Sequence, residues 1–405
     1  MRTLLAEATP LSHFEQKKVL VLTPDTTRTC PLPMIIRSLR DVIGVRAARL
    51  DFMVALGTHT PLAQQDILTL FGIEGPHENQ DGTQFFNHEW NLQGTFVQIG
   101  TFTEKEVEAL SEGRLKERVP IVINKRIFDY DLVLIAGPVF PHEVVGFSGG
   151  AKYLFPGISG GDFLHFFHWL GAVITCKKII GIKDTPVRQA IDKAMEKVRV
   201  PVHCLAMVVN HSSDLCGLFV GDVTEAWSEA ADLSSRVHVK IKKKPFRTVL
   251  GRAPAMYDEI WTAGKVMYKL EQVVADQGTL IIYGPHIREV SRTWGKDIEK
   301  IGYHTRDYFL AQTDRFRDIP RGVLAHSTHV RGTGTYERGV EKPHVNVVLA
   351  TSIPKETCER INLGYMDPSR IRLADYMDSE EEGILFVDHA GEILYRLEQT
   401  QGRSR

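Results

Sequence analysis

The sequence lacks the features that define several protein classes. Its 405 residues contain five cysteines, none in a Cys-x-x-Cys pair, so neither a disulfide framework nor a structural zinc ribbon is predicted. No apolar run approaches the roughly 18 residues of a membrane helix, and the first residues lack a secretory signal's apolar core. A formal net charge of −1 leaves no overall basic field for nucleic acid or acidic membranes. We therefore expect a cytoplasmic enzyme that binds neither.

The sequence does contain an alternation of short apolar runs and helical patterns. Strands are expected within 17–25, 45–57 and 121–138, the last range holding two. Thr60 is expected to cap a helix that has Pro61 at its first position. The segment 163–174 is apolar almost all round and predicts a buried helix. This alternation predicts an α/β fold with mainly parallel sheets covered by helices.

A charged, apolar-poor segment at 239–246 is interpreted as a linker between two domains. We expect an N-terminal cofactor-binding catalytic domain at 1–246 and a C-terminal α/β domain at 247–375, in which 258–274 forms a helix. The tail, 376–405, is expected to join the first domain and to contain a hairpin with its turn near residues 389–391. Two α/β domains place the predicted site in the cleft between them.

Polar side chains follow four of the predicted strands, and ligands of α/β sheets sit beyond the carboxyl ends of strands. The residues are Asp25 and Arg28 in TPDTTRTCP, His59 in LGTHTP, His142 and Lys152 in GPVFPHEVVGFSGGAK, and Lys265 in WTAGK. Each type of residue has an ordinary explanation as a helix cap, a loop histidine or a surface lysine, and Gly149 and Gly150 as a tight turn. Their joint occurrence at successive strand ends favours a functional site.

Two kinds of chemistry fit these residues. A zinc hydrolase would use His142, His165 and His168, but the metal-binding spacing of such enzymes is absent. The alternative has two bases, His59 and His142. Arg28 and Lys265 would grip a carboxylate, and Lys152 would anchor a cofactor. Opposed bases suit a reaction that works from either face of a carbon, such as racemisation.

These motifs resemble those of the nickel-dependent lactate racemase family of 2-hydroxy-acid racemases and epimerases. The resemblance covers most of the chain. It rests on D-T-T-R (25–28), G-T-H (57–59), P-H…GFSGGAK…PG (141–157), His168 and WTAGK (261–265). The lysine motif, with His142 ten residues before it and His168 sixteen after it, is its most specific part.

The resemblance implies a cofactor. In that family the lysine matching Lys152 is bonded through a thioamide to a nickel-pincer nucleotide, the pyridinium-3-thioamide-5-thiocarboxylic acid mononucleotide. The histidine matching His168 completes the nickel coordination, since nickel(II) accepts a square-planar set of donors. Gly149 and Gly150 would let the backbone approach the cofactor. His165 is assigned to packing or to a supporting contact.

The resemblance also implies a mechanism of reversible hydride transfer at C2 of the substrate. His59 and His142 would remove and return the hydroxyl proton, because the unperturbed histidine pKa lies near working pH. Arg28 and Lys265 would hold the carboxylate. Asp25 would orient Arg28 or contact the cofactor. The predicted activity is that of an isomerase.

The sequence departs from the lactate racemases at the predicted substrate pocket. Thr262 stands where they often have glutamine, and Ala151 where they often have arginine. The smaller Thr262 predicts a larger 2-hydroxy acid than lactate, for example a sugar acid. Separate accessory enzymes are expected to build the cofactor. The alternative function is a non-catalytic nucleotide or hydroxy-acid binding protein of the same fold.

Overall fold

The computed structural model describes residues 2–8, 11–73 and 82–398. The chain forms two compact units that interleave along the sequence. The first consists of Met1–Phe140, Phe147–Phe167 and Lys183–Val237, and the second of Pro141–Gly146, His168–Ile182 and His238–Arg405. The domain boundaries expected after residues 246 and 375 therefore stay a prediction.

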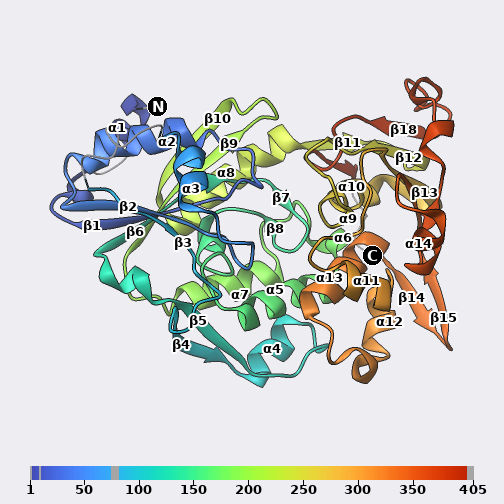
Figure 1. Ribbon diagram of the computed structural model, residues 1–405, viewed down its shortest axis with the longest axis horizontal. Coiled ribbons are helices and arrows are strands. Elements are labelled where there is room, and N and C mark those ends of the chain that lie inside the picture. The colour runs from blue at the N-terminus through green and yellow to red at the C-terminus, as the bar shows by residue number, and fades with distance from the viewer. Residues whose placement is uncertain (1, 9–10, 74–81, 399–405) are drawn as a thin grey trace, which may run out of the picture. The chain divides into compact units, whose positions relative to one another are not determined.

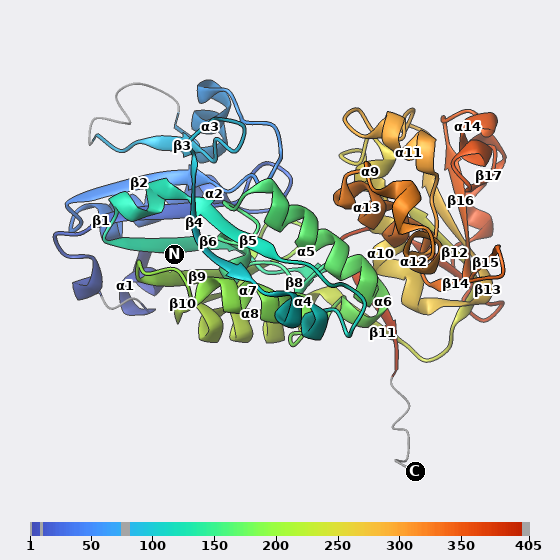
Figure 2. The ribbon, with the colours of Figure 1, turned by 90° about the horizontal axis from the view of Figure 1, so that it is seen from below.

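The first unit is built on a six-stranded sheet with the order β10-β9-β6-β1-β2-β3, and Figures 1 and 2 show β1, β2 and β6 side by side. Every neighbouring pair is parallel except β9 and β10. The strands are β1 (Lys18–Thr23), β2 (Arg49–Val54), β3 (Phe85–Asn87), β6 (Leu132–Pro138), β9 (Val202–Val209) and β10 (Leu215–Asp222). A separate antiparallel pair joins β4 (Phe96–Phe102) to β5 (Val119–Asn124).

Continuous apolar runs explain the central strands, because a parallel strand is buried on both faces. All seven residues of β6 are buried, and only the first residue of β1 and of β2 is exposed. The strands predicted within 17–25, 45–57 and 121–138 are confirmed, as is the fold class.

Helices surround this sheet, and Figure 2 shows α8 along its lower side, below β9. They are α1 (Arg2–Ala8), α2 (Leu32–Leu39), α3 (Gln64–Phe71), α4 (Glu104–Leu110), α5 (Gly161–Ile174), α7 (Pro186–Met195) and α8 (Val223–His238). The buried helix predicted at 163–174 is confirmed as α5. The predicted cap at Thr60 is wrong: α3 begins at Gln64 after Ala63, so Pro61 precedes the helix in the loop that carries His59.

Asp51 on β2 is a fully buried carboxylate that ties three segments of the first unit together. It accepts hydrogen bonds from Arg49 Nε (2.5 Å), the Gln84 backbone N–H (2.8 Å) and the Tyr130 hydroxyl (2.6 Å). Burial and the neighbouring Asp51 carboxylate raise the pKa of Tyr130 well above its ordinary value. Because a buried carboxylate is costly unless it is hydrogen-bonded, these donors make the site favourable.

The second unit contains an all-parallel five-stranded sheet with the order β17-β16-β13-β12-β18. The strands are β12 (Phe246–Arg252), β13 (Val274–Gly284), β16 (Val345–Thr351), β17 (Gly364–Tyr365) and β18 (Ile384–Val387). Two smaller pairs are β11 (Val239–Lys242) with β19 (Leu394–Leu397) and β14 (Gly334–Glu337) with β15 (Val340–Pro343).

Two expectations about this part of the chain are wrong. The start of the expected linker, Val239–Lys242, is strand β11, which pairs in parallel with β19. The tail forms no hairpin within its described residues, because β18 pairs with β12 and β19 pairs with β11. Local alternation indicated the strands correctly, but a turn-like sequence does not decide with which strand each one pairs.

The helices of the second unit are short. They are α6 (Cys176–Ile179), α9 (Ile260–Ala263), α10 (Lys265–Leu270), α11 (Gly295–Ile301), α12 (Arg306–Leu310), α13 (Arg321–Arg331) and α14 (Lys355–Arg360). The single helix expected at 258–274 is divided at Gly264. A Cβ at that position would lie 2.8 Å from the Tyr268 hydroxyl and 2.9 Å from a Val330 methyl group, so only glycine allows this packing.

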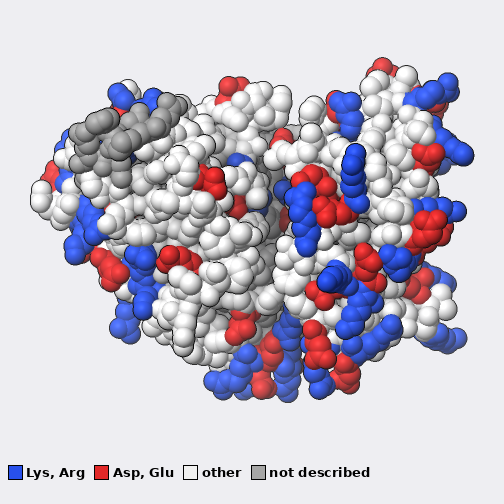
Figure 3. Space-filling view, viewed as in Figure 1, with Lys and Arg blue, Asp and Glu red and all other residues white. Residues whose placement is uncertain are grey.

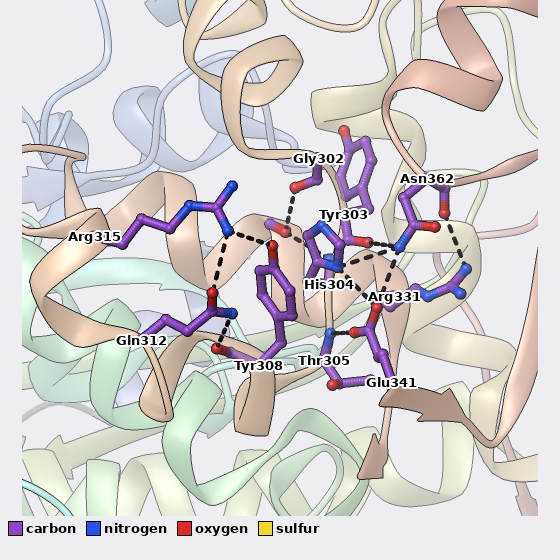
Figure 4. A network of polar contacts seen from close by, with 11 residues as sticks. Gly302, Tyr303, His304, Thr305, Tyr308, Gln312, Arg315, Arg331, Glu341 and Asn362 are labelled. Carbon is purple, nitrogen blue, oxygen red and sulfur yellow. Dashed lines mark hydrogen bonds and ion pairs between the residues drawn. The ribbon is translucent and has the colours of Figure 1, made fainter. Parts of the chain in front are cut away.

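A polar network centred on Glu341 connects α12, α13 and β15, as Figure 4 shows. Glu341 lies 2.8 Å from His304 Nδ1 and accepts from the Thr305 backbone N–H at 2.5 Å. The Asn362 amide donates to Tyr303 O at 3.0 Å, and Arg331 donates to Asn362 O at 3.1 Å. The His304 ring also stacks on Tyr308, with centroids 3.7 Å apart. The network therefore fixes this region of the second unit.

The distribution of charge and the lengths of the helices agree with the near-zero net charge and the absence of long apolar runs in the sequence. Lysine and arginine are interspersed with aspartate and glutamate over the face drawn in Figure 3. Within residues 2–8, 11–73 and 82–398, no helix is both long and apolar enough to cross a bilayer.

Replacing Asp51 with alanine is expected to lower the free energy of unfolding by about 3 kcal/mol, because the Tyr130 hydroxyl and Gln84 N–H lose their buried acceptor. Thermal and denaturant unfolding would measure the change. The control is Asp41→Ala, which removes an exposed partner of Arg2 and should cost less than about 0.5 kcal/mol. Equal effects of the two substitutions would contradict this role of Asp51.

Candidate active site

The sheet of the first unit brings three predicted site segments to one edge. β6, β1 and β2 are parallel neighbours, so their carboxyl ends lie at the same edge of the sheet. Asp25 and Arg28 follow β1, His59 follows β2, and the segment leading to Lys152 follows β6. In the first unit, therefore, side chains distant in sequence are gathered by strand order.

Asp25, which is buried, is paired with the exposed side chain of His59. Asp25 is 7% exposed, and its Oδ2 lies 2.5 Å from His59 Nδ1. Its Oδ1 accepts from the Thr27 hydroxyl at 2.6 Å and the Thr27 backbone N–H at 3.1 Å. Burial raises the pKa of Asp25, but the hydrogen bond and charge of His59, the charge of Arg28 and the Thr27 hydroxyl together hold that pKa well below its ordinary value.

The ionised Asp25 determines which nitrogen of His59 is available. A carboxylate only accepts hydrogen bonds, so His59 Nδ1 carries a proton and donates it. In the neutral ring Nε2 then has the lone pair and is the basic atom. The His59 side chain is 56% exposed, and its backbone carbonyl accepts from Trp90 Nε1 at 2.8 Å. The pair thus presents an oriented base at the sheet edge.

The loop before Lys152 is held by two buried side chains that its local sequence does not reveal. Arg188 on α7 donates to Phe147 O at 2.6 Å, and Trp227 on α8 donates from Nε1 to Ser148 O at 2.9 Å. The Arg188 guanidinium lies 3.9 Å from the Trp227 ring centroid. Burial lowers the pKa of Arg188 to about 10, so it remains charged at neutral pH.

Gly149 and Gly150 are required by this packing. Both have positive φ, +81° and +57°. A Cβ on Gly150 would lie 2.9 Å from the Trp227 ring, and one on Gly149 would lie 2.7 Å from a Val139 methyl group. The glycines thus permit a left-handed backbone that fits closely against protein atoms.

Lys152 lies in a short 3-10 turn, η5 (Gly150–Tyr153), and its loop is joined to that of His59. The Gly157 N–H donates to Lys152 O at 3.0 Å, and Gly157 O accepts from the Gly57 N–H at 2.8 Å. Lys152 Nζ lies 5.8 Å from the Phe167 ring centroid. These bonds connect the predicted cofactor anchor to the predicted base through two glycines.

Tyr153, next to Lys152, is a site residue that sequence reasoning missed. Its hydroxyl lies where a Cβ of residue 137 would be, so Gly137 at the end of β6 makes room for it. Burial raises the pKa of Tyr153 well above its ordinary value, and Arg28 and Asp25 are among the charged groups that also influence it. The Tyr153 hydroxyl therefore stays neutral.

The remaining predicted residues belong to the second unit: His142 in β7 (Pro141–His142), His168 on α5, Thr262 on α9 and Lys265 at the start of α10. The Thr262 hydroxyl donates to Glu259 O at 3.0 Å. Lys265 Nζ lies 4.7 Å from the Tyr257 ring centroid.

Trp261, beside Thr262, stacks on His326, with ring centroids 4.1 Å apart and an interplanar angle of 9°. His326 Nε2 lies 3.1 Å from Trp261 O and donates to it, because a carbonyl can only accept. Burial lowers the pKa of His326 to about 3, so the ring is neutral at physiological pH. No local sequence pattern indicates this contact, since 65 positions separate the two residues.

The donor atoms fit a cofactor that brings most of its own metal ligands. Among the residues that the structure describes, no three His, Cys, Asp or Glu side chains are grouped so that they could hold a metal ion. The zinc cluster considered for His142, His165 and His168 is therefore not formed. A lysine amine in a fixed turn and one imidazole match a covalently anchored group needing a single protein ligand.

Comparisons with known proteins identify the class. Residues 5–179 match the family model described as the lactate racemase N-terminal domain. The chain is 26% identical over 275 residues to the lactate racemase of Thermoanaerobacterium thermosaccharolyticum, covering 66% of this chain and 59% of that one. It is 26% identical over 145 residues to the lactate racemase of Lactiplantibacillus plantarum, covering 35% of this chain and 30% of that one. The chain thus spans less than two thirds of the curated relatives it matches.

Two solved structures extend the comparison over the whole chain. A Thermotoga maritima protein is 33% identical, with a TM-score of 0.85 over 98% of this chain and 96% of that one. The lactate racemase apoprotein of T. thermosaccharolyticum has a TM-score of 0.76 at 19% identity, over 98% and 92%, and so shares the fold. These matches define an α/β protein of two units whose first unit contains most of a lactate racemase N-terminal domain. The chain belongs to the lactate racemase family.

Asp25→Asn tests the first-unit pair through acid stability. Because folding lowers the pKa of Asp25, its contribution to stability is present above the unfolded pKa of about 4 and is lost as pH falls below it. The variant should be less stable by about 1–3 kcal/mol at pH 7 and should lose less stability between pH 5 and pH 2. Thermal unfolding across this pH range measures both effects. Parallel pH curves for the two proteins would contradict the assignment.

Proposed function

We propose that this protein is a racemase or epimerase that inverts C2 of a 2-hydroxy acid by reversible hydride transfer. It is thus an isomerase. The observation that carries the proposal is the Asp25–His59 pair on a loop hydrogen-bonded, through Gly57 and Gly157, to the loop of Lys152. Membership of the lactate racemase family supports it. This chemistry requires an oriented base and an anchored cofactor, and the two loops that would supply them are hydrogen-bonded to each other.

His59 removes the hydroxyl proton of one enantiomer at Nε2, because Asp25 holds the Nδ1 proton. The Asp25 carboxylate balances the positive charge that the ring gains. His142 has the corresponding role for the other enantiomer. Each histidine returns the proton when the reaction runs in the opposite direction, which microscopic reversibility requires of a racemase.

Arg28 and Lys265 bind the substrate carboxylate, for which a planar guanidinium is well suited. Thr262 lines the substrate pocket. Its hydroxyl donates to the α9 backbone at Glu259 O, so it presents a small side chain to the ligand. We expect the pocket to accept a 2-hydroxy acid larger than lactate, such as a sugar acid.

Lys152 would hold a nickel-pincer nucleotide covalently, with His168 as the protein ligand of nickel and with Asp25, Gly149 and Gly150 beside the nucleotide. The group would supply the hydride-transfer chemistry at C2 of the substrate. Loop packing supports the anchoring role, because Arg188 and Trp227 fix the carbonyls of Phe147 and Ser148 before the lysine. Accessory enzymes that build the nucleotide are the expected partners.

The direct test is production together with such accessory enzymes, followed by intact-protein mass, nickel analysis and a chiral screen of 2-hydroxy acids that includes lactate and sugar acids. A covalent adduct with about one nickel per chain and inversion of one acid class supports the proposal. Full loading with no inversion of any acid would favour a binding protein instead.

Lys152→Ala and Lys152→Arg separate the covalent role of the lysine from its charge. Both variants should lack the adduct and the activity, because an arginine keeps the cation but has no amine that forms the thioamide. Intact mass and peptide mapping measure attachment. The control, Lys178→Ala, removes an exposed lysine of α6 and should load normally. An adduct retained in either Lys152 variant would contradict the assignment.

His59→Ala should lower kcat by roughly 10²–10⁴-fold, the usual contribution of a positioned general base. The adduct at Lys152 should remain, because the substitution leaves the lysine and its loop in place. Racemisation rates and intact mass on the same preparation measure the two effects. A variant that keeps the wild-type rate would show that His59 is not the base.

A further inference from the structure

His142 lies between two different partners for the same ring nitrogen. The Val144 backbone N–H donates to His142 Nδ1 at 3.1 Å, and the Glu143 carboxylate lies 3.6 Å from that atom. His142 is 7% exposed. One partner is a donor and the other only accepts, so they favour opposite protonation states of Nδ1.

The Val144 hydrogen bond leaves the ring unsuited to proton transfer at Nε2. When Nδ1 accepts a hydrogen bond, the neutral ring carries its proton on Nε2. Such a ring has no lone pair at Nε2 and cannot act as a base there. For His142 to exchange a proton with a substrate through Nε2, the Nδ1 atom must instead carry a proton and donate it.

Glu143 is placed to accept a hydrogen bond from a protonated Nδ1. Burial raises the pKa of Glu143, but the charge of His142, a backbone hydrogen bond and the charge of Lys269 bring it well below its ordinary value. Lys269 is itself buried and donates to Pro141 O, next to His142. Burial lowers the pKa of His329 to about 4, so that ring is neutral at physiological pH. Glu143 is thus an ionised acceptor beside His142.

The Val144 N–H is a fixed competitor. Gly171 on α5 packs against it so closely that a Cβ there would lie 2.7 Å from a Val144 methyl group and 3.1 Å from Val144 O. The Val144 backbone therefore has little freedom to move away. The ring itself must change partner, from the backbone N–H to the carboxylate.

We propose that Glu143 is a positioning residue for His142: its carboxylate accepts a hydrogen bond from a protonated Nδ1, so that in the neutral ring Nε2 has the lone pair and is available for proton transfer. This inference rests on the proposed function for its catalytic meaning. In the step, the substrate O–H bond breaks, a bond forms between the proton and Nε2, and the resulting imidazolium is neutralised by Glu143. The arrangement matches the Asp25–His59 pair. The difference is that, among the contacts described above, no backbone N–H competes with Asp25 for His59 Nδ1.

The first test uses the apoprotein, so it does not depend on cofactor or activity. Protein labelled with ¹⁵N-histidine would report the proton location on each ring, with the His142 signals assigned by their loss in His142→Gln. Wild type should show a measurable population with the proton on Nδ1. Glu143→Gln should shift the neutral ring to the form protonated on Nε2 and lower the His142 titration midpoint by about one pH unit.

Glu341→Gln is the matched control, because Glu341 is the partner of another histidine in the same unit, His304 (Figure 4). It should alter the His304 signals and leave those of His142 unchanged. Glu143→Asp, which keeps the charge, should restore part of the Nδ1-protonated population, and it replaces Glu143→Gln should the latter fail to fold. Unchanged His142 signals in a folded Glu143 variant would overturn the proposal.

The second test uses the loaded enzyme. Glu143→Gln should lower kcat by roughly 10- to 10³-fold with KM within about twofold, and the Lys152 adduct should be unaffected. If the loaded wild type inverts no 2-hydroxy acid while the apoprotein signals respond as expected, the proposed function falls and the assignment of Glu143 stands. If the wild type is active and Glu143→Gln retains its kcat, the positioning role falls alone.

Discussion

The loop that carries Lys152 depends on two buried side chains, Arg188 and Trp227, which hold the carbonyls of residues 147 and 148. A buried guanidinium is costly unless its donors are used. Arg188 donates from Nη2 to the loop and stacks on the indole, while its Nε has no hydrogen-bond partner among the residues that the structure describes. The loop must meet this packing, and glycines at 149 and 150 are the residues that fit. The position of Lys152 therefore follows from the core of the first unit.

The same loop orders the sheet edge around it. One backbone hydrogen bond, from the Gly57 N–H to Gly157 O, connects this loop to the loop of His59, which lies two residues after Gly57. Asp25 reaches His59 from the neighbouring strand end, because β1 and β2 run in parallel with matched register. The backbones that carry the base and the anchoring lysine are thus held by hydrogen bonds and strand order.

Much of the fold was predictable from the sequence, because its signals are local. Unbroken apolar runs predicted β1, β2, β5 and β6, and an apolar segment predicted α5. The errors have long-range causes. β18 and β19 pair with strands more than 100 residues away. At Gly264, where the expected helix is divided, Tyr268 and Val330 occupy the space of a Cβ, so that the packing requires glycine. Pairing and packing of this kind leave no periodicity in the sequence.

In the candidate site, too, local motifs were predictable from the sequence and long-range contacts were not. Motif spacing indicated Asp25, His59 and Lys152, and the structure joins them within one unit. Motif spacing did not indicate Arg188 or Trp227, which lie 36 and 75 positions beyond Lys152 and outside any motif. Glu143 belongs to the motif that contains His142, but the motif does not indicate its role, because that role depends on the direction of the Val144 N–H. Supporting residues are chosen by geometry, so a single sequence contains little trace of them.

The choice between an enzyme and a binding protein depends on what the buried charges accomplish. Asp25 is 7% exposed and ionised, and one of its oxygens is committed to a histidine whose side chain is 56% exposed. A ligand grip needs cations facing the ligand, and Arg28 and Lys265 would suffice for that. A carboxylate behind the ring adds no contact to a ligand; it orients the imidazole and stabilises the charge that the ring gains on taking a proton. Burying a carboxylate for this purpose favours proton transfer over binding alone.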